Sequence, residues 1–161
     1  MNYTFRVQTE DEIQNYRGGS KICEIYDFFQ YARELQSKIP LAFGQLKARF
    51  GEPHFISKNY EEMYEYNLCA ESETGEITYL CAYCGPTGPA IGGIPSDPNS
   101  QKAAQALVNY IIEAAPIDYE MEAYYLDVPS KLTLGVKNGQ PHYSEEEIDF
   151  DDPELKKLFN F

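Results

Sequence analysis

Two neighbouring runs of period-two sequence, joined by a turn, constrain the fold of this chain more than any other feature. Between residues 62 and 70, aromatic and apolar side chains recur at every second position, which is the period of a strand. Residues 77–84 are apolar on both alternating faces, as in a central strand. Glu73-Thr74-Gly75-Glu76 between them is a turn sequence. The pair predicts an antiparallel hairpin inside a sheet.

Helical patterns lie on both sides of this hairpin. Residues 22–39 carry apolar side chains at three- and four-residue spacing, with Ser20 as a candidate cap. Pro40 separates them from a second short helix over residues 41–50. A third helix is predicted from Asp97-Pro98, a cap followed by proline at the first helical position, to about residue 115.

The second half of the chain predicts more strands. Residues 119–128 alternate, and residues 131–144 form a hairpin around Asn138-Gly139, the strongest short hairpin signal in the chain. Hairpins and helices that are segregated along the chain predict an α+β fold. We expect one antiparallel sheet of four to five strands, containing 62–70, 77–84, 119–128 and 131–137, with two to three helices packed on it. A single domain spans residues 1–161, and residues 1–20 and 145–161 are partly irregular apart from a short strand near Tyr3.

Composition places the chain among folded intracellular proteins. Its 161 residues suffice for one core, and 43% hydrophobic residues with fourteen Tyr and nine Phe are too many for a disordered acidic tail. The N-terminus has no apolar segment of the secretory type, and the longest uncharged run, residues 77–96, is broken by Pro and Gly. We therefore expect a cytoplasmic protein with reduced cysteines and no membrane span.

Charge is distributed unevenly along the chain. Residues 59–155 hold nineteen acids and three bases, a net charge of −16, within a whole-chain net charge of −13. A field of this sign attracts cations over long distances, so it indicates a basic protein partner. The same field repels phosphates, which argues against nucleic acid as a direct partner.

Cys81-Ala82-Tyr83-Cys84 has the spacing of half a zinc site or of a redox pair. A structural zinc site needs four ligands, and no second close pair exists among Cys23, Cys69, His54 and His142. Side chains three positions apart on a strand point to opposite faces, so the two thiols should diverge. We expect buried, metal-free cysteines that are not bonded to each other.

The segment from Gly85 to Gly93 reads as a glycine-rich loop before a helix. Gly88 and Gly93 have the spacing of phosphate-loop glycines, but Ile94-Pro95 stand where such a loop requires Lys and Ser or Thr. We expect a rigid loop, and loops of this kind often line binding sites. The residues of a pocket here would be Tyr83, Cys84, Gly85, Gly88, Gly92, Gly93 and His142.

Carboxylates alternate along residues 118–122, so they share one strand face. Three interpretations remain open: a solvated face, a docking surface for a basic protein, or a metal or acid–base site, for which no spacing provides ligands. The residues expected to bind a partner are Asp118, Glu120, Glu122, Tyr124, Tyr60, Glu61 and Glu65.

The leading hypothesis is a small acidic module that binds a basic protein, such as an immunity or inhibitor protein that neutralises a toxin or a nucleic-acid-processing enzyme. Complementary charge would speed association, and aromatic anchors would supply affinity. One alternative is a ligand-binding domain or small enzyme with a pocket beside Gly85–Gly93. Another is a structural or regulatory module without catalysis. The sequence favours a non-catalytic protein, and it predicts no cofactor and no metal.

Overall fold

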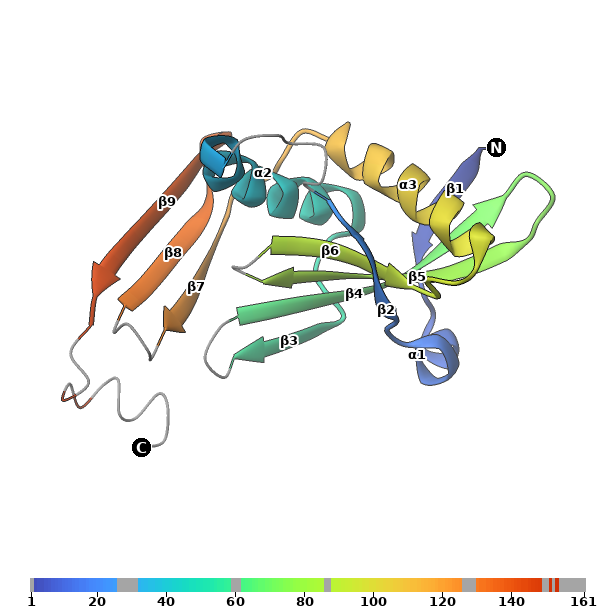
Figure 1. Cartoon of the computed structure of the whole chain (residues 1–161), viewed down its shortest axis with the longest axis horizontal. Helices are drawn as coiled ribbons and strands as arrows, with labels where there is room; N and C mark the ends of the chain where they lie inside the picture. The colour runs from blue at the N-terminus through green and yellow to red at the C-terminus, as the bar shows by residue number, and fades with distance from the viewer. Residues whose placement is uncertain are drawn as a thin grey trace.

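The computed structural model describes residues 2–25, 32–58, 62–85, 88–125, 130–148, 151 and 153. For residues 32–39, 57–58, 62–63, 84–85, 88, 123–125 and 132 it describes the backbone alone. The elements in chain order are β1 (Tyr3–Val7), α1 (Glu10–Tyr16), β2 (Ser20–Glu24), α2 (Ala32–Phe50), β3 (Phe55–Lys58), β4 (Glu62–Ser72), β5 (Ile77–Gly85), β6 (Gly88–Gly93), α3 (Pro98–Ile112), β7 (Tyr119–Tyr125), β8 (Ser130–Lys137) and β9 (Gln140–Glu147). The protein is an α+β fold with antiparallel sheets, as the sequence predicts (Figure 1).

The larger sheet is built around the predicted β4–β5 hairpin. Its strand order is β1-β4-β5-β6-β2, and β3 pairs with the first half of β4. Leu68 on β4 and Leu80 on β5 are opposite each other and fully buried. Burial of both faces explains why β5 lacks a polar side: Leu80 and Cys81, on its opposite faces, are both fully buried.

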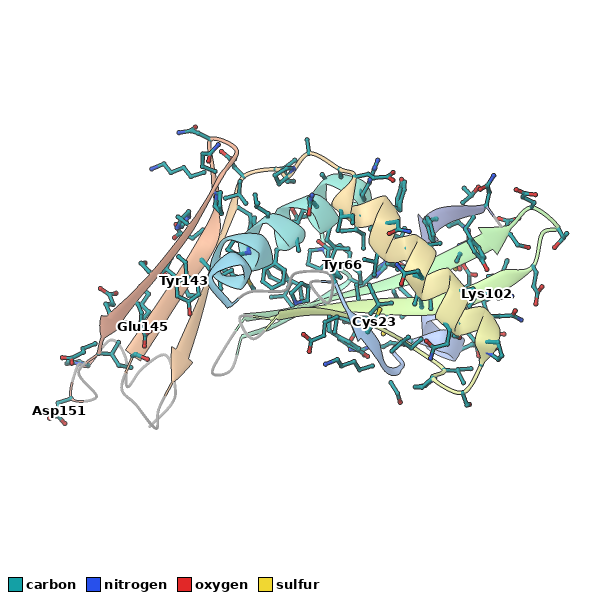
Figure 2. The ribbon with its side chains drawn as sticks, turned by 45° about the horizontal axis from the view of Figure 1, so that its top comes forward. Cys23, Tyr66, Lys102, Tyr143, Glu145 and Asp151 are labelled. Atoms are coloured by element: carbon teal, nitrogen blue, oxygen red, sulfur yellow. The ribbon has the colours of Figure 1, made fainter. Side chains whose placement is uncertain are left out.

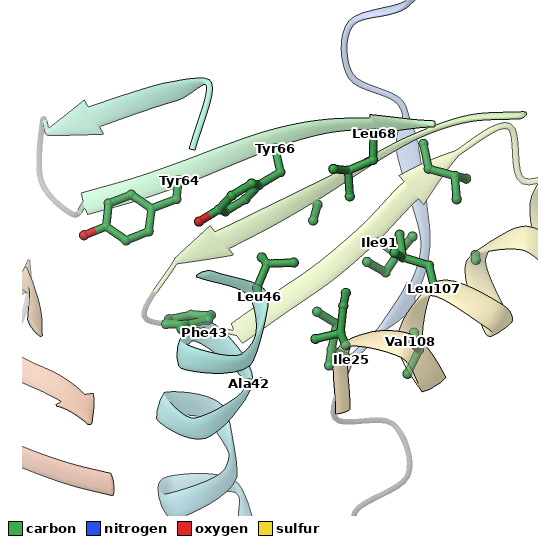
Figure 3. Close-up of a cluster of buried hydrophobic side chains, with 14 of the residues drawn as sticks. Ile25, Ala42, Phe43, Leu46, Tyr64, Tyr66, Leu68, Ile91, Leu107 and Val108 are labelled. Carbon is green, nitrogen blue, oxygen red and sulfur yellow. The ribbon is translucent and has the colours of Figure 1, made fainter. Parts of the chain in front are cut away.

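Two helices cover one face of this sheet and form the core with it. Figure 3 shows Tyr66 and Leu68 on β4 facing Leu46 of α2 and Leu107 of α3. The α3 stripe is buried as its three–four spacing predicts, and Asp97 caps the helix by accepting a hydrogen bond from the Asn99 amide at 2.9 Å.

A second sheet holds the three C-terminal strands in the order β7-β8-β9. Asn138 and Gly139 both have positive φ (54° and 76°), so the predicted two-residue hairpin turn is confirmed. Helix α2 contacts β8 and β9 as well as β6 and α3, and the Tyr119 hydroxyl donates to the Pro40 carbonyl at 2.8 Å. Helix α2 thus connects the two sheets through a continuous core.

The prediction of one sheet was wrong, because α2 packs between the two strand groups (Figure 1). The predicted helices over 22–39 and 41–50 also need correction. Residues 22–24 belong to β2, which pairs with β6, and the two helical segments are one helix with Pro40 inside it. Proline in a helix interior removes a hydrogen bond and costs about 3 kcal/mol. Here burial of Pro40 and the bond from Tyr119 to its carbonyl offset that cost.

The glycine-rich loop was also predicted wrongly. Residues 88–93 form β6, which pairs with β5 and β2. The terminal segments contain more regular structure than predicted: α1 lies within residues 1–20, and β9 extends to Glu147. Thr9 and Glu12 form a capping box at α1, a signal that the sequence analysis overlooked.

Candidate binding pocket and acidic surfaces

A pocket of about 350 Å³ opens where three separate parts of the chain meet. Its lining comes from the end of α1 with the following Arg17-Gly18-Gly19, from the first residues of β5, and from the connection between β6 and α3. Of the residues predicted to form a pocket, Gly93 lies in this lining. The pocket thus borders the end of the glycine-rich segment, where β6 leads into α3.

Arg17 lines this pocket, and contacts with Glu65 and Phe55 hold its side chain in place. The Arg17 guanidinium donates two hydrogen bonds to the Glu65 carboxylate, at 2.7 and 3.2 Å, and lies 3.6 Å from the centre of the Phe55 ring. Burial would raise the pKa of Glu65, but the bonds from Arg17 and Asn67 outweigh it and lower that pKa. Glu65, predicted to bind a partner, therefore neutralises an arginine of its own chain.

Glycines allow the segment that follows Arg17 to pack directly on the sheet. A side chain on Gly19 would come within 2.7 Å of the Gly93 nitrogen, and one on Gly92 within 2.6 Å of Cys81 Sγ. Contacts this short leave no room for a Cβ atom. Gly92 is thus explained by close packing against Cys81 and Gly19, and Gly93 by packing against Ile22 and Leu80, rather than by a phosphate-binding loop.

The pocket combines exposed apolar surface with carboxylates. The side chains of Tyr16, Ile77 and Ile94 line it and are 48, 39 and 59% exposed. Tyr16 also stacks on Tyr79, another lining residue, with 3.8 Å between ring centres. The carboxylates come from Glu76, before β5, and from Asp97, before α3, with Glu71 and Glu73 exposed on the same hairpin. We call Glu71, Glu73, Glu76 and Asp97 the pocket-side acids.

The thiols are placed for packing rather than chemistry. Cys81 is fully buried and is a free thiol, so its predicted burial is confirmed; Cys84 is described by its backbone alone. Burial raises the pKa of Cys81 to about 11. Burial, with a hydrogen bond that Cys69 donates to Glu12 (3.4 Å), raises the pKa of Cys69 to about 12. Both thiols are protonated at neutral pH, which makes them poor nucleophiles and metal ligands.

The predicted acidic strand face lies on the second sheet, and its three carboxylates differ in the hydrogen bonds and ion pairs that they form. The Asp118 carboxylate accepts hydrogen bonds from the Asn138 and Gly139 amides at 2.9 and 3.2 Å, which lower its pKa. Glu122 pairs with Lys131 at 3.0 Å. Glu120 stays 61% exposed at its side chain and lies 3.9 Å from His142 Nε2. Asp118 therefore caps a turn, and Glu120 is the most available of the three.

The other predicted site residues do not converge on one place. Tyr60 and Glu61 lie outside the described residues, and Tyr124 is described by its backbone alone. His142 lies on β9 in the second sheet and does not join the pocket, whereas Tyr83 packs under residues 18–19. Gly85, Gly88 and Gly92 are strand residues. Figure 2 shows Tyr143 and Glu145 on β9, in the other sheet from the strands that adjoin the pocket.

Sequence reasoning missed Tyr16, Ile77, Ile94 and Asn99 as a group, because they come from three distant segments. Among the described residues, no cluster of three or more His, Cys, Asp or Glu side chains could hold a metal ion. Within the same part of the chain, each helix is too short or too polar to cross a membrane. Comparisons with protein-family models, curated proteins and solved structures found no match.

The hydrogen bond to His54 makes a pH dependence testable. His54 Nδ1 accepts a hydrogen bond from the backbone amide of Asn67 at 2.7 Å, which requires the neutral ring. Burial lowers the pKa of His54, although the nearby Glu65 acts in the opposite direction. A histidine whose pKa is lower when folded stabilises the protein above its unfolded pKa of about 6.5, and this stabilisation is lost as the pH falls below that value.

We therefore expect the free energy of unfolding to fall between pH 7 and pH 5, in part through His54. His54→Asn keeps an acceptor near the Nδ1 position and removes the titration, so its decline should be shallower than that of the wild type. Urea unfolding at both pH values measures this, with His142→Asn on the second sheet as the matched control. An equal decline in wild type and His54→Asn, or an NMR titration midpoint for His54 above 6.5, would contradict the assignment.

Proposed function

We propose that this protein is a binding module that docks a basic protein partner, with the pocket and the pocket-side acids at the centre of the docking surface. One observation carries the proposal: three of the eight large hydrophobic side chains that are exposed among the described residues, Tyr16, Ile77 and Ile94, surround one pocket that carboxylates also line. Protein interfaces combine buried aromatic or apolar anchors with charged surroundings that steer the partner.

Charge supports a basic partner. The net charge of −16 on residues 59–155 includes all four pocket-side acids. Arg17, the base in the pocket lining, is neutralised by its ion pair with Glu65. Complementary charge raises association rates, while desolvated anchors slow dissociation. A concrete form of this function is an immunity or inhibitor protein that covers the cationic cleft of a toxin or of a nucleic-acid-processing enzyme.

The test begins with affinity capture from native cell extract at low salt, and continues with stopped-flow binding of the purified partner. Two variants remove equal charge from different surfaces: Glu71, Glu73 and Glu76→Gln beside the pocket, and Glu145, Glu146 and Glu147→Gln on β9. We expect the first variant to slow association roughly tenfold at low ionic strength and to flatten the salt dependence, because steering acts locally. The second should change the association rate much less.

Each other result has a defined meaning. A larger effect of the β9 variant would move docking to the second sheet, where Asp118, Glu120 and Glu122 lie. An acidic partner, or association rates that neither variant changes, would overturn the proposal and leave the carboxylates as a solvated surface.

A second candidate function is supported by the dimensions of the pocket. Its volume of about 350 Å³ falls at the lower end of the range for small-molecule sites, roughly 300–1,000 Å³. Under this alternative the protein binds a small ligand between α1, β5 and α3. Native mass spectrometry of protein purified from its own cells tests it: an adduct that disappears in Ile94→Glu would support a ligand-binding domain.

A further inference from the structure

Part of the pocket lining is exposed and apolar, and we call this part the apolar flank. Tyr16, Ile77 and Ile94 contribute it from three different segments, and each is more than a third exposed. Contact between water and exposed apolar surface is unfavourable, so a partner group that covers it is stabilised there. The natural complement is an unbranched side chain that can lie along the flank and displace water.

The polar features of the pocket select for a cation at the end of that side chain. Asn99 positions two carboxylates: its side-chain nitrogen lies 3.4 Å from Glu76 Oε1, and its backbone nitrogen donates to Asp97 Oδ1 at 2.9 Å. Among the described residues, neither Glu76 Oε2 nor Asp97 Oδ2 accepts a hydrogen bond. Two carboxylate oxygens near one pocket thus retain acceptor capacity that a donor-only cation can use.

Arginine fits this combination better than lysine. Its guanidinium presents five donors in a planar fork, so one group can bond to two carboxylates, and its flat face stacks on aromatic rings such as those of the Tyr16–Tyr79 pair. Its three methylenes are the apolar stem that the flank requires. Arg17 does not compete for the two carboxylates, because its guanidinium is bonded to Glu65 and lies against Phe55.

We propose that this pocket receives an arginine side chain of the basic partner, clamped between Glu76 and Asp97 with its stem against Ile77 and Ile94. The inference rests on the proposed function and specifies its anchor. It differs from a site for free arginine, whose α-carboxylate would be repelled by the pocket-side acids.

Titrations followed by two-dimensional NMR test the pocket directly. The probe is N-acetyl-arginine methylamide, compared with the uncharged citrulline analogue, the lysine analogue and free L-arginine. We expect amide shifts at Tyr16, Ile77, Ile94, Asn99 and Ser100, with the arginine amide binding at least about fivefold more tightly than the citrulline, lysine and free-arginine probes. Equal binding of the citrulline analogue, tighter binding of free arginine, or shifts elsewhere would overturn the inference.

Charge variants identify the clamp. Asp97→Asn keeps a good helix cap, so the double variant Glu76→Gln/Asp97→Asn should fold. It should weaken the arginine probe about tenfold, because charge-assisted hydrogen bonds are lost. Glu145→Gln/Glu147→Gln, which removes the same charge from β9 in the second sheet and outside the pocket lining, is the matched control and should bind as the wild type does. A double variant that folds and binds the probe unchanged would overturn the inference.

The captured partner separates this inference from the proposed function. If the partner is basic and the double variant raises its dissociation rate about tenfold, both stand. If the partner is basic and its dissociation rate does not change, the arginine pocket fails while the proposed function stands. If the partner is acidic, the proposed function fails and the arginine anchor loses its source, whatever the small probe does.

Discussion

Replacing Phe43 by alanine is expected to lower the free energy of unfolding by about 4 kcal/mol, the largest effect that we predict for this protein. Phe43 is 1% exposed on α2 and belongs to a buried cluster that includes Leu68 of the larger sheet and Leu134 of the second sheet. Its ring also lies 6.1 Å from that of Tyr119 on β7. Truncating such a residue removes apolar burial and leaves a cavity, at a cost of roughly 3–5 kcal/mol.

The same variant tests whether residues 1–161 form a single domain. If the two sheets share one core, hydrogen exchange at the backbone amides of Leu68 and Leu134 should accelerate by the same factor in Phe43→Ala. That factor should correspond to the loss in the free energy of unfolding measured by urea unfolding followed by circular dichroism. Ile117→Ala, at a side chain that is 46% exposed, is the control and should stay within about 0.5 kcal/mol of the wild type. Faster exchange at Leu134 alone would mean that the second sheet unfolds separately, against the single-domain prediction.

The elements that could be predicted from the sequence are those with local causes. The β4–β5 hairpin follows from a period of two and a turn sequence, and the β8–β9 hairpin from Asn138-Gly139. Helix α3 follows from Asp97 and a stripe with helical spacing. Each of these signals acts within a few residues, so tertiary contacts did not have to be known.

The elements that could not be predicted depend on distant partners. Strand β6 is rich in glycine, which has low strand propensity, and it forms because β5 and β2 flank it and residues 18–19 pack against it. The division into two sheets depends on where α2 packs, and Pro40 concealed that the two helical segments are one. Tertiary packing overrode local preference in both cases.

For the candidate site, the sequence predicts the sign of the charge but not the role of each carboxylate. The sequence established that carboxylates dominate residues 59–155, but not which of them are already engaged. Glu65 holds Arg17 across 48 residues, and Asp118 caps a turn twenty residues away. The pocket itself is assembled from residues 16–19, 76–79 and 93–100, so no local spacing could have indicated it.

Gly135→Ala is expected to destabilise the second sheet by about 3 kcal/mol, at the upper end of the range for overpacking. Gly135 lies on the central strand β8, opposite Glu120 on one side and His142 on the other. A Cβ atom there would lie 2.2 Å from the Tyr119 carbonyl oxygen and 3.1 Å from His142 Nε2. The histidine can rotate away, but the carbonyl belongs to the neighbouring strand, so β7 and β8 would have to separate.

Urea unfolding of Gly135→Ala measures the loss, and Thr133→Ala is the matched control, because Thr133 lies two residues away on the same face of β8. We expect this control to remain within about 1 kcal/mol of the wild type, the span of strand propensities. The NMR shifts that the arginine probe induces at Tyr16 and Ile94 should persist in Gly135→Ala, since the pocket adjoins the larger sheet. Unchanged stability would contradict the close approach of β7 to β8 at Gly135, because it would show that the strands leave room for a Cβ atom there. Loss of the probe shifts in a folded Gly135→Ala protein would instead mean that the second sheet takes part in forming the pocket.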